Sequence, residues 1–135
     1  MTRFFLVLSA VFFGFILWII FLADTGRTSV FFDFVKAIPY GDKVGHACLF
    51  GTLTFGINLG LSFRRWKILG LNLHVGTIFV VVFVVLEELS QARFPNRTLD
   101  PFDLFADAVG ITVATVLLWL VERRRKGPSS AISST

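Results

Sequence analysis

The sequence predicts an all-α protein: a four-helix transmembrane bundle with a short interfacial helix in the first outer loop. Two observations support this prediction. First, the mean hydropathy is +0.77 and only 16% of the residues are charged, whereas soluble domains are about a quarter charged. Second, the chain has four apolar segments, and the length of each is close to the roughly 20 residues that cross a hydrocarbon core. Open strands would leave backbone groups unpaired in lipid, so we expect helices.

The four apolar segments divide the chain without an internal repeat. They run over residues 4–23, 44–63, 71–89 and 102–121. No Ala-x-Ala cleavage site precedes Asp24, so we expect the first segment to be a retained helix and not a signal peptide. We therefore expect one membrane domain over residues 1–126, followed by a disordered polar tail over residues 127–135.

The loop between the first two segments carries its own helical pattern. Its apolar residues recur at helical spacing: Phe31, Phe34, Val35 and Ile38. Such a pattern is typical of a short helix lying in the membrane interface, and Pro39 follows as its stop signal.

The start of the last segment has clear helix-start signals. Asp100 suits the N-cap and Pro101 suits the first helical position. Asp103 falls in the first turn, where the helix dipole favours a carboxylate. Asp107 has no such structural explanation.

The distribution of Lys and Arg predicts the orientation. One side would carry Arg3, Arg64, Arg65, Lys67 and residues 123–126, and the other Arg27, Lys36, Lys43, Arg93 and Arg97. The positive-inside rule therefore places both termini of a multi-pass membrane protein in the cytoplasm. The basic run 123–126 is then a topology signal, and we expect no nucleic-acid partner.

Polar groups from three segments reach a similar depth. At about 1.5 Å of rise per residue, His46 lies about 6 Å and Asp107 about 10 Å below the outer boundary. Glu87 and Glu88 lie about 6–8 Å below it, counted from the inner end of their helix. Buried carboxylates are costly in hydrocarbon, so this convergence is the strongest functional signal in the chain. Glu87 is offset by about 100° from Glu88, so we expect Glu87 to be peripheral, paired or directed towards the membrane interface.

Four short motifs in this region resemble one family. Residues 42–46, Asp-Lys-Val-Gly-His, resemble the Asp-Lys-x-x-His signature of VanZ-like membrane proteins. Residues 87–91 resemble that family's acidic-Glu-x-x-Gln motif, and residues 94–97 its Phe-x-Pro-x-Arg turn. Asp103 and Gly110 match the pattern Asp-x-x-x-Asn-x-x-Gly that opens the last helix.

The resemblance spans residues 42–110 and implies a small multi-pass bacterial protein with no established catalytic activity. The founding member of the family is associated with low-level resistance to the glycopeptide teicoplanin. Asp107 stands where the family usually has Asn. A carboxylate there must be protonated, paired with a base or bound to a cation.

The predicted polar site has six members: His46, Glu88, Gln91, Arg97, Asp103 and Asp107. We expect Lys43, Arg93 and Arg97 to contact an anionic head group of a membrane lipid or lipid-linked cell-wall precursor at the outer leaflet, with an effect on glycopeptide susceptibility. A purely structural role for the polar cluster stays open. So does assembly into a homo-oligomer.

Two other functions are kept as alternatives. One is an intramembrane metal- or carboxylate-dependent enzyme acting on a lipid-linked substrate, and the other is a small transporter or accessory subunit. The sequence favours neither, because Ser90 has no evident base beside it and no tight His-x-x-x-His spacing occurs. We expect no cofactor and no metal.

Overall fold

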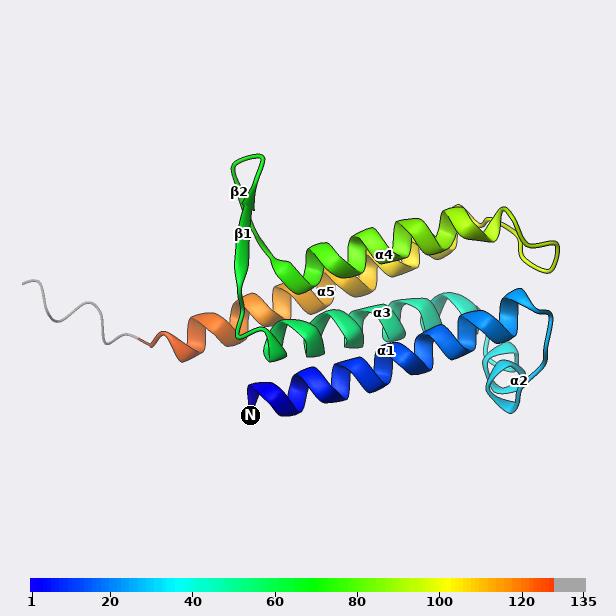
Figure 1. The fold of residues 1–135 in the computed structure, drawn as a ribbon, viewed down its shortest axis with the longest axis horizontal. Coiled ribbons are helices and arrows are strands. Elements are labelled where there is room, and N and C mark those ends of the chain that lie inside the picture. The colour runs from blue at the N-terminus through cyan, green and yellow to red at the C-terminus, as the bar shows by residue number, and fades with distance from the viewer. Residues whose placement is uncertain (128–135) are drawn as a thin grey trace, which may run out of the picture.

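The computed structural model describes residues 1–127, and these are mostly helical (Figure 1). The helices are α1 (Thr2–Asp24), α2 (Val30–Lys36), α3 (Gly41–Gly60), α4 (Val75–Gln91) and α5 (Pro101–Arg125). Two short strands, β1 (Arg65–Ile68) and β2 (Leu71–His74), lie between α3 and α4. The predicted tail lies outside the described residues, except for Gly127.

The four long helices lie side by side and give the molecule two distinct ends (Figure 1). One end, called here the α2 end, carries α2 and the loop that joins α4 to α5. The other, called here the hairpin end, carries the N-terminus, the last turns of α5 and the two strands, which project away from the helices. Helix α3 is central, because it packs most extensively on α5, then on α1, and also on α4.

Two helices, α1 and α5, are long and apolar enough to cross a membrane by length and composition. The other two long helices fall outside this pair, since α4 has only 17 residues and α3, with its glycines and polar residues, is less apolar. The short helix expected in the first outer loop is confirmed as α2, whose first turn is capped by Ser29.

The third apolar segment was predicted incorrectly as a helix from residue 71. The helix begins at Val75, and residues 65–74 form an antiparallel hairpin, so the fold is not wholly helical. Leu69 and Gly70 both have positive φ, at 50° and 82°. Positive φ at both central residues is the mark of a type I′ turn, which matches the twist of a two-residue hairpin.

The core is formed where α1, α3, α4 and α5 meet. Its buried residues are Ile16, Phe50, Leu53, Val80, Val84 and Ile111. Helices α3 and α5 approach closely at Gly110, because a Cβ there would lie 2.1 Å from the backbone oxygen of Ala47. This backbone contact between α3 and α5 also brings the side chain of His46 on α3 within hydrogen-bond reach of Asp107, which lies one turn before Gly110 on α5.

The start of α4 is fixed by Asn58, which is fully buried. Its Oδ1 accepts a hydrogen bond from the Gly76 backbone N–H at 2.9 Å, and its Nδ2 donates to Thr77 Oγ1 at 3.1 Å. One of the N–H groups that a helix start leaves unpaired is thereby satisfied by α3. This contact holds the hairpin end of the bundle together.

Candidate functional site

His46 and Asp107 meet at the α2 end, as their predicted depths require. His46 Nδ1 lies 2.9 Å from Asp107 Oδ1, and Asp107 is fully buried. His46 Nε2 also lies 3.8 Å from Asp103 Oδ2. The imidazole from α3 thus bridges two carboxylates on successive turns of α5, and the buried Asp107 is paired with a base.

Lys43 is held by three carboxylates from two helix starts. Its ammonium donates to Asp42 at 3.0 Å, to Asp100 at 2.9 Å and to Asp103 at 2.8 Å. The bond from Lys43 holds the pKa of Asp100 below its ordinary value. A lysine has three N–H donors, and all three are used here. Lys43 therefore has no donor left for the anionic head group that the sequence suggested.

Asp100 is the confirmed N-cap of α5 and also joins α4 to the site. Its side chain accepts a hydrogen bond from Phe102 N at 2.9 Å. Its own backbone N–H donates to Glu88 Oε1 at 2.9 Å. The other oxygen of Glu88 is buried without a hydrogen-bond partner. Glu88 thus fixes the loop before α5 and does not bond Gln91.

Of the places that the sequence allowed for Glu87, the structure shows the paired one, and the side chain is buried and not peripheral. Gln91 Nε2 donates to both of its oxygens at 3.0 Å, a contact between residues four apart on the helix. Arg97 Nη2 reaches Glu87 Oε1 at 3.3 Å, and Arg97 Nη1 lies 3.8 Å from Asp24 at the end of α1. Arg97 therefore pairs with Glu87 of α4 and with Asp24 at the end of α1.

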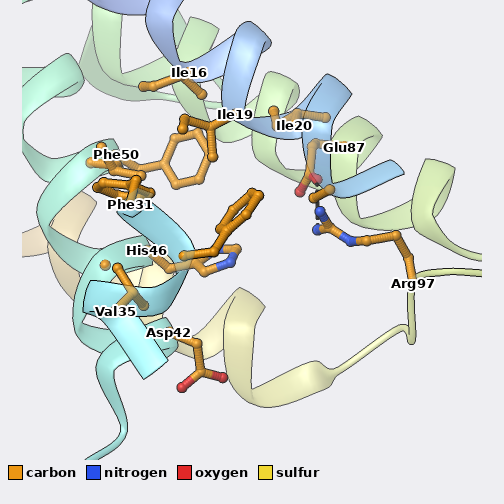
Figure 2. Close-up of a pocket in the computed structure, with 14 residues that line it drawn as sticks. Ile16, Ile19, Ile20, Phe31, Val35, Asp42, His46, Phe50, Glu87 and Arg97 are labelled. Atoms are coloured by element: carbon orange, nitrogen blue, oxygen red, sulfur yellow. Dashed lines mark hydrogen bonds and ion pairs between the residues drawn. The ribbon is translucent and has the colours of Figure 1, made fainter. Parts of the chain in front are cut away.

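A cavity of about 130 Å³ opens beside this cluster (Figure 2). Most of its wall is apolar and comes from α1 and α2, including Ile16, Ile19 and Phe31. Its polar lining consists of Asp42, His46, Glu87 and Arg97. Figure 2 shows the Glu87 carboxylate and the Arg97 guanidinium facing each other at one side of the space.

Two of the six predicted site residues, His46 and Arg97, line the cavity. The other four lie behind it and hold its helices in place. Sequence analysis missed Asp42 as a cavity residue and left Glu87 out of the site. The spacing of Glu87 and Gln91, four apart, was the available signal. Arg93 is exposed and forms no ion pair among residues 1–127.

The α2 end has more carboxylates than bases. Eight of the nine acidic side chains lie there: Asp24, Asp33, Asp42, Glu87, Glu88, Asp100, Asp103 and Asp107. Only five basic side chains share that end: Arg27, Lys36, Lys43, Arg93 and Arg97. Three buried carboxylate oxygens, one each on Asp24, Glu88 and Asp107, accept no hydrogen bond. The site is therefore rich in acceptors and short of donors.

The described part of the chain shows no metal-ligating group, and the hydroxyl of Ser90 is held by the helix backbone. Within residues 1–127, no group of three or more His, Cys, Asp and Glu side chains is arranged to hold a metal ion. Ser90 Oγ donates to the Glu87 backbone oxygen at 2.6 Å. That is an ordinary helix hydrogen bond, and it engages the hydroxyl away from any side-chain base.

Comparison with known proteins adds no relative. No family model matches the chain, and neither the curated proteins nor the solved structures contain a match. The resemblance to VanZ-like proteins therefore depends on the motifs within residues 42–110.

Proposed function

We propose that the chain is a four-span protein of the bacterial cytoplasmic membrane. The apolar surface supports this, because large hydrophobic side chains point outward from several helices. Val11 on α1 is 66% exposed, Leu86 on α4 is 61% exposed and Val113 on α5 is 54% exposed. A soluble monomer rarely exposes a continuous apolar surface of this extent, whereas lipid covers it without cost.

The proposed orientation places the hairpin end in the cytoplasm. Eight of the thirteen basic side chains lie at that end, accompanied by only one acid, Glu122. The α2 end carries the other eight acids. Basic residues near helix ends favour the cytoplasmic side, so α1 begins and α5 ends in the cytoplasm.

Reporter fusions test this orientation. Green fluorescent protein fused after Lys126 should fluoresce, and alkaline phosphatase at the same place should stay inactive. Alkaline phosphatase fused after Arg27, in the loop following α1, should be active. Activity of the phosphatase fused after Lys126 would overturn both the orientation and the outward placement of the cavity.

We further propose that the cavity binds the polar end of an amphiphile from the outer leaflet. The observation that carries this is the shape of the lining: isoleucine and phenylalanine walls that lead to one group of charged side chains. Apolar walls with a few convergent polar groups are the usual design of ligand sites. At about 130 Å³ the cavity holds one small head group, and the chains would lie along the apolar surface of α1.

The charges of the lining favour a head group that donates hydrogen bonds. Asp42 and Glu87 present acceptors to the cavity, and Arg97 is already engaged by Glu87 and Asp24. An ammonium or hydroxyl group finds partners there, whereas a bare phosphate meets two carboxylates. The head-group class is therefore amine- or hydroxyl-bearing, which shifts the proposal away from the purely anionic head group that the sequence suggested.

A glycine on the cavity wall permits a sharp test. Gly45 lines the cavity, and a Cβ there would meet no atom within 4 Å. Gly45→Leu should therefore fill the space without moving a helix. Gly14 on α1 has equally open surroundings and does not line the cavity, so Gly14→Leu is the matched control.

Native mass spectrometry provides the readout, with phosphatidylethanolamine and phosphatidylcholine as the two added lipids, because they have the same net charge but the trimethylammonium of phosphatidylcholine donates no hydrogen bond. We expect the unmodified chain and Gly14→Leu to retain phosphatidylethanolamine more strongly than phosphatidylcholine. Gly45→Leu should lose this preference. Equal retention of both lipids by all three proteins would overturn the proposed site.

The VanZ-like motifs extend the proposal to the cell envelope. A protein that binds amine- or hydroxyl-bearing lipid or lipid-linked cell-wall precursor at the outer leaflet would alter the access of a glycopeptide to its target. Expression in a susceptible Gram-positive host should raise the minimum inhibitory concentration of teicoplanin. Gly45→Leu should abolish that rise and Gly14→Leu should preserve it; a rise that Gly45→Leu leaves intact would separate resistance from the cavity.

A further inference from the structure

The hairpin at residues 65–74 has one apolar face and one polar face. Opposed residues of an antiparallel pair lie on the same side, and sides alternate along each strand. The pairs Trp66↔Leu73 and Ile68↔Leu71 therefore share one face, and the pairs Arg65↔His74 and Lys67↔Asn72 share the other.

The polar face is attached to the bundle at its base. Arg65 pairs with Glu122 on α5, and His74 Nε2 lies 3.4 Å from the same carboxylate. The apolar face has no such cover, since Trp66 is 55% exposed and Leu71 is 62% exposed. Leu69, at the turn, is almost completely exposed. An isolated two-stranded hairpin is marginal in water, so an uncovered apolar face on one calls for a surface to lie against.

The direction of the hairpin limits what that surface can be. Figure 1 shows β1 and β2 running across the long direction of the helices and away from the bundle. If the helices cross the membrane, as proposed above, the hairpin lies parallel to the membrane plane. It then lies at the level where α3 ends and α4 begins, which is the boundary between head groups and acyl chains.

The positive charge around the hairpin favours a membrane leaflet that carries anionic lipids. Arg64, which precedes β1, and Lys67 are both exposed, and α5 ends nearby in the exposed residues Arg123, Arg124 and Arg125. Anionic lipids attract clustered Lys and Arg at a membrane surface. A tryptophan beside the strand start fits the interface, where aromatic side chains gather.

We propose that residues 65–74 form an interfacial anchor on an anionic leaflet. Trp66, Ile68, Leu71 and Leu73 enter the acyl boundary, and Arg64 and Lys67 meet lipid phosphates. This proposal rests on the proposed membrane-spanning arrangement for the orientation of the hairpin. It does not depend on the cavity or its ligand.

Tryptophan quenching tests the anchor and the spans separately. The chain has three tryptophans, Trp18, Trp66 and Trp119. One variant keeps only Trp66, through Trp18→Phe and Trp119→Phe. A second keeps only Trp18, which is exposed on α1 and reports the bundle itself. Both are placed in bilayers of phosphatidylglycerol or phosphatidylcholine brominated near the head group or near the chain end.

The anchor predicts a specific pattern of quenching. Trp66 should be quenched by the shallow bromines more than by the deep ones, and more in phosphatidylglycerol than in phosphatidylcholine. Lys67→Gln should reduce the preference for phosphatidylglycerol. Lys36→Gln, an exposed lysine at the other end, should leave that preference unchanged.

Other outcomes overturn one proposal or the other. Quenching of Trp18 without quenching of Trp66 would end the anchor and leave the spans intact. Quenching of neither would end the spans and, with them, the in-plane hairpin. Cross-linking of Leu69→Cys between copies, in a Cys48→Ser background with Trp66 unquenched, would make the hairpin a contact between copies and not a membrane anchor.

Discussion

The α2 end and the hairpin end of the same bundle differ in how their charged side chains are arranged. At the α2 end, acids and bases from α3, α4, α5 and the loop before α5 are buried or half-buried and are paired with one another. At the hairpin end, most basic side chains are exposed and an apolar face is uncovered. The difference teaches that the first end is organised around internal contacts and a small cavity, whereas the second presents its groups to the surroundings.

The largest expected effect breaks the contact on which the α2 end depends. Gly110→Ala places a methyl group against the Ala47 backbone oxygen, and backbone cannot move aside as a side chain can. α3 and α5 must separate, which lengthens the contact between His46 and Asp107. We expect a loss of about 2–4 kcal/mol in the free energy of unfolding.

Unfolding of the purified protein in detergent, followed by circular dichroism, measures this loss. Gly14→Ala is the control, because the site is open and the helix gains an alanine. Equal stability of Gly110→Ala and Gly14→Ala would show that the two helices do not touch at Gly110.

The next effect lies at the hairpin end. Asn58→Leu removes the acceptor of the Gly76 N–H and the partner of Thr77 in a fully buried place. Leaving such groups unpaired costs about 1–3 kcal/mol. Asn96→Leu, at an exposed loop residue, should cost far less. Thermal unfolding of both variants measures the difference, and similar losses would contradict a specific role for Asn58.

A smaller effect tests the charge pairing at the α2 end. Lys43→Met leaves Asp100 and Asp103 without their shared cation, and we expect the melting temperature at pH 7 to fall by about 3 °C. The control Lys36→Met removes an exposed lysine and should change little.

The pH dependence of that effect has a definite sign. Lys43 keeps the pKa of Asp100 below its ordinary value in the folded protein. The resulting stability is present above the unfolded pKa of about 3.9 and is lost as the pH falls through the lower folded value. The difference between the unmodified protein and Lys43→Met should therefore shrink on acidification. A difference that grows would contradict the pairing.

The smallest effect is local and concerns the base of the hairpin. Burial lowers the pKa of His74 from its ordinary value, and the nearby Arg65 lowers it further. His74 then binds a proton more readily in the unfolded chain than in the folded one. Acidification below about pH 6.5 therefore destabilises the folded hairpin where it joins the bundle. Hydrogen exchange of residues 71–76, corrected for intrinsic rates, should rise relative to α3 on acidification. His74→Gln should remove this rise; an unchanged rise would assign it to another group.

Much of the bundle follows from sequence pattern alone. The places of the four apolar segments, the short helix α2 and the N-cap at Asp100 all depend on local signals of spacing and capping. The meeting of His46 and Asp107 follows from helix rise, because depth along a helix is fixed by residue number.

The hairpin and the partners of Arg97 required information that a local pattern lacks. Leu71 and Leu73 extend the apolar run that precedes Glu87. Residues 71–74 were therefore predicted as the start of a helix, although the alternation of leucine with Asn72 is typical of a strand. The turn signal was weak, since leucine rarely takes the positive φ found at Leu69. Arg97 pairs with Glu87 and Asp24 because its loop returns to the end of α1, where Asn96 bonds the Asp24 backbone. The path of such a loop depends on tertiary contacts, which a local sequence pattern does not contain.

Asp100 links three helix ends through one residue. Its carboxylate holds both the first turn of α5 and the ammonium of α3, while its backbone N–H is held by α4 through Glu88. A pull on any of these helices is consequently transmitted to the other two over a few ångströms. A displacement of the first turn of α3 would therefore strain the contacts of Asp100 with α4 and α5.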